Sequence, residues 1–293
     1  MKKAKDYFKV AQEAFKDALE INDQYARAYL AQGALLYGQK VQSIGKWGNE
    51  RIVEEKIDEA IVQYRKALDA EIKHPKAYVD IKANYNLGLA ITVKENLQPS
   101  YCSQPNEEAI EALQNVISAY DRETIIDIIQ QLTAKAYYQL GLLYRNCSDR
   151  KLKEADKLQL YDDAVKEFKN SILLFSTKPE KDWQQDIWAI RLSLANTYLL
   201  SAELGKTDMY QQAIDIYNEI IQHYEEHQNI STNIAAETYY NLGLALTQTN
   251  NTTKAAEKYR QVLDLEAPPE FQEKLILKSL QNKAHVQLGK LQE

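Results

Sequence analysis

Asn241-Leu242-Gly243-Leu244 is followed, twelve residues after its glycine, by Ala255 and then by Tyr259 and Val262. Small side chains such as Gly243 and Ala255 are typical of positions where two helices approach closely, because a larger side chain would separate the axes. Apolar residues recur around them at intervals of three and four, which predicts one apolar stripe on each of two antiparallel helices. A single helical hairpin cannot bury both stripes, so this stretch predicts a stack of several hairpins.

Weaker copies of this stretch recur along the chain. The small residue of the first helix recurs at steps of 46 to 55 residues, at Gly33, Gly88, Gly141, Ala195, Gly243 and Gly289. The second helix carries an alanine followed four positions later by a large apolar residue, and these alanines are Ala11, Ala60, Ala109, Ala164, Ala213 and Ala255. Such self-similarity indicates a protein built from stacked repeats.

The spacing of small, aromatic and leucine residues resembles the tetratricopeptide repeat, whose period is about 34 residues. Residues 236–269 match that length, and the earlier copies are longer because the gap between the two small residues decreases from 27 to 12 along the chain. The resemblance covers nearly the whole chain. It implies an all-α fold, a right-handed α-solenoid of stacked antiparallel helical hairpins.

We predict one such solenoid over residues 1–293. Its expected parts are a half repeat at 1–23, hairpins at 24–73, 75–121, 124–177, 180–228 and 231–267, and a capping helix at 270–291. The expected interior is rich in tyrosine, since an aromatic ring can be buried while its hydroxyl reaches a polar partner. The tyrosines at interior spacing are Tyr29, Tyr64, Tyr137, Tyr144, Tyr198, Tyr217, Tyr239 and Tyr259.

The composition limits the classes of partner. A formal net charge of −6 argues against binding to a phosphate backbone, so we expect no nucleic-acid partner. Neither a signal peptide nor a stretch long enough to span a membrane is apparent, which predicts a cytoplasmic protein with no membrane partner. The two cysteines, Cys102 and Cys147, lie in expected connections and are predicted to be free thiols.

The strongest suggestion of an enzyme is His223-Tyr224-Glu225-Glu226-His227, which matches the H-x-x-E-H string of some zinc peptidases. The string lies at the polar end of a second helix, and His285 is the one later histidine, so no convincing third ligand follows. Phosphate-binding loops, nucleophile elbows and paired-cysteine metal motifs are also missing from the sequence. We therefore expect no enzyme, no catalytic residues, no metal and no cofactor, with a zinc hydrolase as the distant alternative.

In the family that this chain resembles, the first helices line a concave face. The resemblance implies that residues two and three before the close-approach position, and one and four after it, point into this groove. The candidate partner-binding residues, including basic residues near the same face, are Lys82, Tyr85, Asn86, Lys135, Tyr138, Gln139, Arg145, Asn196, Tyr240 and Asn241.

A column of carboxamides at Asn86, Gln139 and Asn241 is expected to face solvent. Carboxamides both donate and accept, so they can pair with the backbone of an extended peptide whatever its side chains. The neighbouring basic residues favour an acidic segment. A polar residue that is merely tolerated on an exposed face is the alternative explanation.

We therefore predict a non-enzymatic protein–protein interaction scaffold that binds a peptide or protein segment in the concave groove. The alternative is a sensor or docking region of a larger signalling, protease or ATPase assembly. Residues 7–18 match a second helix whose first helix is missing, so their apolar flank needs cover. That cover could come from a longer array, from a neighbouring domain or self-association, or from the loop at 38–48 folding back.

Overall fold

The fold consists of α-helices joined by short connections. The computed structural model describes residues 2–22, 25–47, 50–73, 78–97, 104–122, 127–147, 152–177, 184–227, 230–268 and 271–291, and these residues form twelve helices and no strand. The helices are α1 (Lys2–Ile21), α2 (Ala26–Trp47), α3 (Glu50–Lys73), α4 (Val79–Leu97), α5 (Glu107–Arg122), α6 (Asp127–Asn146), α7 (Glu154–Ser176), α8 (Gln184–Glu203), α9 (Met209–His227), α10 (Thr232–Gln248), α11 (Thr252–Asp264) and α12 (Phe271–Lys290).

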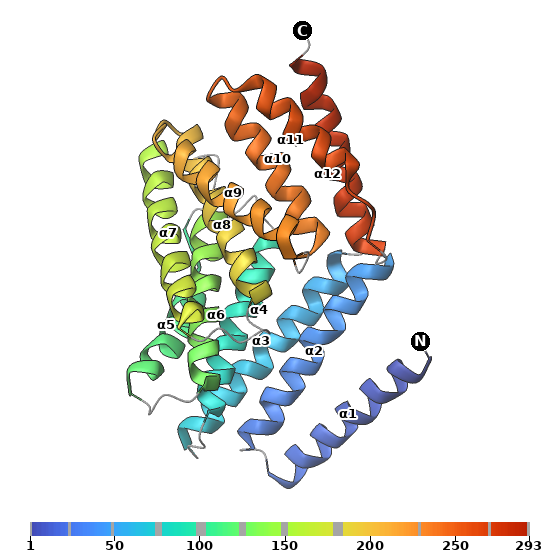
Figure 1. The fold of residues 1–293 in the computed structure, drawn as a ribbon. Coiled ribbons are helices and arrows are strands. Elements are labelled where there is room, and N and C mark those ends of the chain that lie inside the picture. Colours follow the sequence, from blue (N-terminus) through green and yellow to red (C-terminus); the bar gives the residue numbers. More distant parts are fainter. Residues whose placement is uncertain are drawn as a thin grey trace. The chain divides into compact units, whose positions relative to one another are not determined.

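The chain divides into two compact units, with unit 1 at Met1–Lys151 and unit 2 at Leu152–Glu293. Unit 1 contains α1 to α6, and unit 2 contains α7 to α12. Within each unit every helix contacts the next one along the chain, and neighbouring helices run in opposite directions (Figure 1). The predicted all-α class of stacked helical hairpins is confirmed, whereas the right hand of the superhelix and the single domain stay predictions.

Three glycines of the first helices, Gly33, Gly88 and Gly243, lie where the two helices of a hairpin approach closely. A Cβ added to Gly243 would lie 2.5 Å from the Tyr259 ring, and a Cβ on Gly33 would lie equally close to the Tyr64 ring. A Cβ on Gly88 would lie 2.6 Å from Leu113 Cγ. The side chain that packs on each of these glycines is therefore the large one four positions after the small alanine of the second helix. The expected close approach is confirmed at these three hairpins, and the side chain that fills it is one helical turn beyond the alanine.

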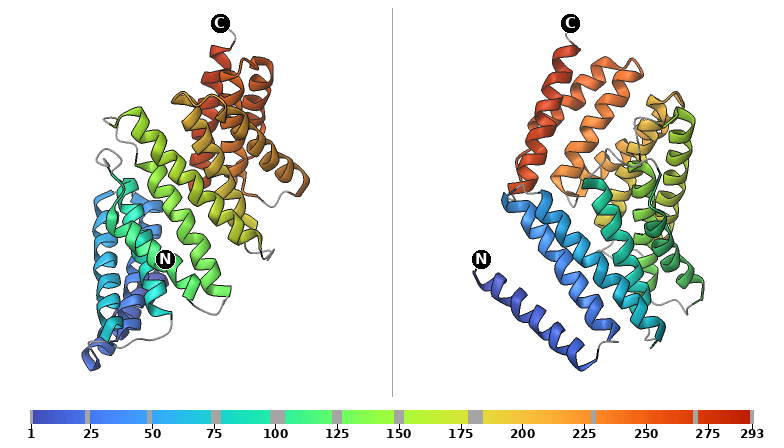
Figure 2. Two further views of the ribbon diagram at one scale, coloured as in Figure 1. Left: turned by 90° about the vertical axis from the view of Figure 1, so that its left-hand side faces the viewer. Right: turned by 180° about the vertical axis from the view of Figure 1, so that it is seen from behind.

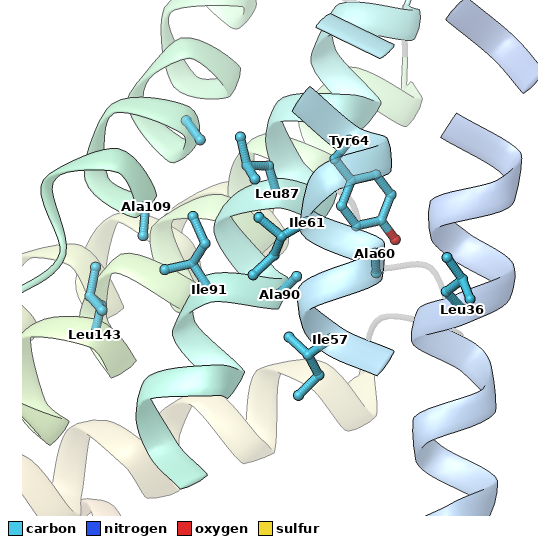
Figure 3. Packing of buried hydrophobic residues seen from close by; sticks show 11 residues of the cluster. Leu36, Ile57, Ala60, Ile61, Tyr64, Leu87, Ala90, Ile91, Ala109 and Leu143 are labelled. Carbon is cyan, nitrogen blue, oxygen red and sulfur yellow. The ribbon is translucent and has the colours of Figure 1, made fainter. Parts of the chain in front are cut away.

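The core of unit 1 shows how this contact extends from one hairpin to the next. In Figure 3, Leu36 of α2 lies on one side of α3, which contributes Ile57, Ala60, Ile61 and Tyr64. The same cluster continues through α4, α5 and α6, with Leu87, Ala90, Ile91, Ala109, Ala112 and Leu143. A second helix is thus packed between its own first helix and the next one, which is the arrangement that a stacked repeat requires.

Two tight turns close the hairpins of unit 2. Gly205, between α8 and α9, has φ +106°, and Asn250, between α10 and α11, has φ +60°. After each of them, a backbone N–H bonds five residues back, from Lys206 to Ser201 at 3.2 Å and from Asn251 to Leu246 at 2.8 Å. These are Schellman-type helix ends, in which a left-handed residue lets the chain reverse while the last carbonyls stay bonded.

The tyrosine-rich interior is observed in large part. Tyr64, Tyr198, Tyr217, Tyr239 and Tyr259 are buried, whereas the other three tyrosines at interior spacing are half-buried. The small second-helix alanines from Ala60 onward are all buried, and Ala11 on α1 is only partly covered.

The prediction of two free thiols is wrong at Cys147. This residue follows the last turn of α6, is buried and is disulfide-bonded. The other cysteine of the sequence, Cys102, lies outside the described residues. A low cysteine count therefore gives no support for a reducing compartment, because two cysteines suffice for one bond.

Across the described helices, none is both long enough and apolar enough to cross a membrane.

Gly243→Ala is expected to lower the free energy of unfolding by about 1–3 kcal/mol, because the new methyl group overlaps a fully buried ring. Gly38→Ala is the matched control, since a Cβ there meets nothing within 4 Å and alanine is the better helix former. Urea unfolding followed by circular dichroism measures both. A Gly243→Ala chain as stable as the original would show that the close approach is not required.

Candidate functional site

The candidate partner-binding residues lie on the first helices of both units. Unit 1 places Lys82, Tyr85 and Asn86 on α4, and Lys135, Tyr138, Gln139 and Arg145 on α6. Unit 2 places Asn196 on α8, and Tyr240 and Asn241 on α10. In unit 1, α4 contacts both α2 and α6; in unit 2, α10 contacts both α8 and α12. Each unit therefore has its own row of adjoining first helices.

None of these side chains is buried. Lys82 is exposed, and the other nine candidates are partly exposed. Partial exposure is what a groove-lining residue requires, since part of the side chain packs on the helix and the polar tip stays available. Tyr85 illustrates this, because it packs against a core cluster that includes Ile81, Leu113 and Leu140.

Asn196 is the centre of a hydrogen-bond network in unit 2. Its Oδ1 accepts a bond of 2.7 Å from the Tyr217 hydroxyl of α9 and a bond of 2.8 Å from Asn241 Nδ2 of α10. Its own Nδ2 donates to Glu237 Oε1 at 2.9 Å. The Asn196 side chain thus links α8 to α9, the second helix of the same hairpin, and to α10, the first helix of the next hairpin. Tyr217 and Glu237 were not among the sequence candidates, although both follow from the repeat register.

This network changes the interpretation of two candidates. Asn196 was expected to point into the groove and Asn241 to face solvent, yet each uses part of its hydrogen-bonding capacity inside unit 2. In unit 1, Asn86 and Gln139 occupy the position of Asn241 on their helices, two residues before the glycine. Neither forms a side-chain hydrogen bond to any of the residues that the structure describes. A bound segment would find both carboxamides with their full capacity available.

Two buried phenols flank the network in unit 2. The Tyr239 hydroxyl donates to Glu225 Oε1 at 2.9 Å, and burial, followed by this bond and the Glu225 charge, raises the pKa of Tyr239 well above its ordinary value. Burial likewise raises the pKa of Tyr259, whose ring lies 5.9 Å from that of Tyr240. Both groups therefore stay neutral at physiological pH.

The histidines of the H-x-x-E-H string belong to an aromatic stack. The rings of His223 and His227 lie 4.4 Å apart, and Trp188 of α8 stacks on His223 at 4.2 Å. The Arg191 guanidinium lies 5.2 Å from the Trp188 ring and forms an ion pair with Glu219. The stack joins α8 to α9, and sequence analysis did not anticipate the part played by Trp188 and Arg191.

No set of three or more His, Cys, Asp or Glu side chains in the described ranges is arranged so that it could hold a metal ion. A zinc site at this string would need a third ligand from elsewhere. The two histidines are accounted for by their packing between α8 and α9.

Comparison with known proteins gives a structural likeness and no family. No family model matches the chain, and no curated protein matches it. One similar solved structure is described as a circular tandem repeat protein with novel repeat topology and enhanced subunit contact surfaces; it is 14% identical, with a TM-score of 0.39. The match covers 98% of this chain, which spans 65% of the length of that protein. A likeness this distant carries no statement about function.

Asn196→Ala is expected to lower the free energy of unfolding by about 1–3 kcal/mol, because the fully buried Tyr217 loses the acceptor for its hydroxyl. The same change should cost less in a Tyr217→Phe background, where no hydroxyl is left without that acceptor. Asn86→Ala serves as the control and should stay within about 0.5 kcal/mol. Equal costs of Asn196→Ala in the two backgrounds, measured by urea unfolding, would contradict the network.

Proposed function

We propose that the chain is a non-enzymatic, tetratricopeptide-like interaction scaffold, which binds an extended acidic peptide or protein segment across α4 and α6 of unit 1. The observation that carries this proposal is the contrast between the carboxamides of the two units. Asn241 is bonded to Asn196, whereas Asn86 and Gln139 have no bond of this kind to the described residues. Carboxamides that stabilise nothing inside the fold are the ones suited to an external backbone.

The spacing of the two helices suits an extended segment. Adjoining helices pack with their axes about 8–10 Å apart. An extended chain advances about 3.3 Å per residue, so Asn86 and Gln139 would meet backbone groups about three residues apart. Tyr85 and Tyr138, which precede these carboxamides in the sequence, are half-buried, so their exposed part can add apolar contact.

The charge near these carboxamides favours an acidic segment. Lys82 is exposed on α4, and Lys135 and Arg145 are partly exposed on α6. In unit 2, by contrast, Glu237 lies one turn before the corresponding Asn241 on α10 and accepts a hydrogen bond from Asn196. Since like charges repel and opposite charges steer association, an acidic ligand is favoured by the first helices of unit 1.

A displayed library of random peptides, panned on the immobilised full chain, tests this proposal. Selected peptides should be rich in Asp and Glu, and their affinity, measured by calorimetry, should decrease as salt is added. Asn86→Ala combined with Gln139→Ala should weaken binding about tenfold or more. The melting temperature should stay almost unchanged, because neither side chain bonds to the described part of the fold.

Gln114→Ala is the matched control, since Gln114 is an exposed carboxamide on a second helix of the same unit. It should bind selected peptides as the original chain does. Peptides that bind equally well to the double variant, or a library from which nothing is enriched, would contradict the proposed surface.

A further inference from the structure

The first and the last described helices are of opposite type, since the repeat register makes α1 a second helix and α12 a first helix. Among the described residues of each unit, α1 packs on α2, and α12 packs on α10 and α11. The right-hand view of Figure 2 shows α1 beside α2.

The apolar face of α1 is wider than the part that α2 covers. Ala11, Phe15 and Ala18 are partly buried. An adjoining stripe is exposed at Tyr7, Val10, Ala14 and Ile21, with Tyr7 at 73% and Ile21 at 88% exposure. Exposed apolar side chains that line up along one helix are typical of a contact surface.

The surface of α12 opposite its buried side carries exposed apolar residues beside small and polar ones. Leu277, Leu280 and Ala284 are buried, and the opposite stripe consists of Leu275, Ser279, Asn282, Val286 and Gly289. All five of these residues are exposed, with Val286 at 59%.

The two stripes match when the helices run antiparallel. Along α12 the stripe residues are separated by four, three, four and three positions, and the residues at 21, 17, 14, 10 and 7 of α1 repeat this spacing in reverse. In this register Leu275 meets Ile21, Val286 meets Val10 and Gly289 meets Tyr7. Apolar pairs thus lie toward both ends of the stripes, and the polar Ser279 and Asn282 face Asp17 and Ala14 between them.

In this register the Tyr7 ring lies opposite Gly289. The internal hairpins also place a large side chain on a glycine, but there it is the residue four positions after the second-helix alanine, which on α1 is Phe15. A Cβ at Gly33 or Gly243 would collide with a tyrosine ring, whereas a Cβ at Gly289 would meet nothing within 4 Å. Gly289 is thus an open close-approach position, and Tyr7 is an exposed tyrosine that can fill it.

The charges along one border of the stripes are also complementary. Lys274 and Lys278 are exposed beside the α12 stripe, and Asp17 and Glu20 are exposed on α1. In the antiparallel register these lysines and carboxylates lie on the same side at similar heights. Glu20 is 3.7 Å from Lys16 within α1, so Asp17 is the carboxylate most available to a second chain.

We propose that the chain associates with itself head to tail, with the exposed stripe of α1 in one copy docking antiparallel on the exposed stripe of α12 in the next. The interface is heterologous, because the surfaces that meet are different parts of the chain. A contact made by one pair of helices is small, so the association is expected in the micromolar range or weaker.

Sedimentation velocity over a concentration series tests the proposal with the full chain. The original chain should form species larger than a monomer as its concentration increases. Val10→Asp and Val286→Asp should each stay monomeric alone, because each loses one of the two surfaces. Mixed together they should form a one-to-one dimer and nothing larger, since one intact α1 then meets one intact α12.

Leu173→Asp is the matched control, because Leu173 is an exposed leucine on α7, outside both stripes, and its substitution should leave association unchanged. Asp17→Lys and Lys278→Asp should each weaken association, and the two changes combined in one chain should restore it. Circular dichroism checks that all variants keep their helices. An original chain that is monomeric at every concentration would overturn the proposal, as would a Val10→Asp or Val286→Asp chain that self-associates as the original does.

Discussion

The packing of one large side chain against a glycine of the neighbouring helix determines the spacing of the hairpins. Tyr64, Leu113 and Tyr259 each occupy this place, and all three are fully buried. Because a glycine has no Cβ, the second helix can approach until its ring or leucine rests on the backbone of the first. Within each unit the second helix of a hairpin also contacts the first helix of the next, so the hairpins of a unit stack in succession.

Much of this arrangement could be predicted from the sequence, because the small residues mark close approach and their spacing marks the repeat. The glycines at 33, 88 and 243 were assigned to the correct contacts. The side chain that packs on each glycine was not predicted correctly. The small alanine of the second helix was expected at this contact, but the large residue four positions after that alanine occupies it. Side chains on a helix lean toward its N-terminus, so the side chain one turn later covers the contact.

The polar side chains were harder to predict, because their partners lie far away in the sequence. Asn196 and Asn241 are 45 positions apart, and their bond depends on how closely α8 approaches α10. A rule that places residues on one helix face could not show that the two would satisfy each other. The disulfide at Cys147 was missed for a similar reason, since cysteine pairing depends on distances that the sequence does not contain.

The same repeat position has two environments in this chain. In unit 2 the carboxamide before the leucine and glycine, Asn241, bonds to Asn196 of the neighbouring first helix. In unit 1 Asn86 and Gln139 occupy this position and form no side-chain hydrogen bond to the described residues, which is why we propose them as ligand-binding groups. The proposed self-association likewise depends on the exposed stripes of α1 and α12.

A double-mutant cycle at Gly88 and Leu113 tests the central contact most directly. Leu113→Ala removes the side chain that rests on Gly88, so a Cβ added by Gly88→Ala no longer meets Leu113 Cγ at 2.6 Å. The account predicts that Gly88→Ala destabilises the original chain and that this cost is lost in the Leu113→Ala background, with a coupling of about 1 kcal/mol or more in urea unfolding. Strictly additive costs would contradict it.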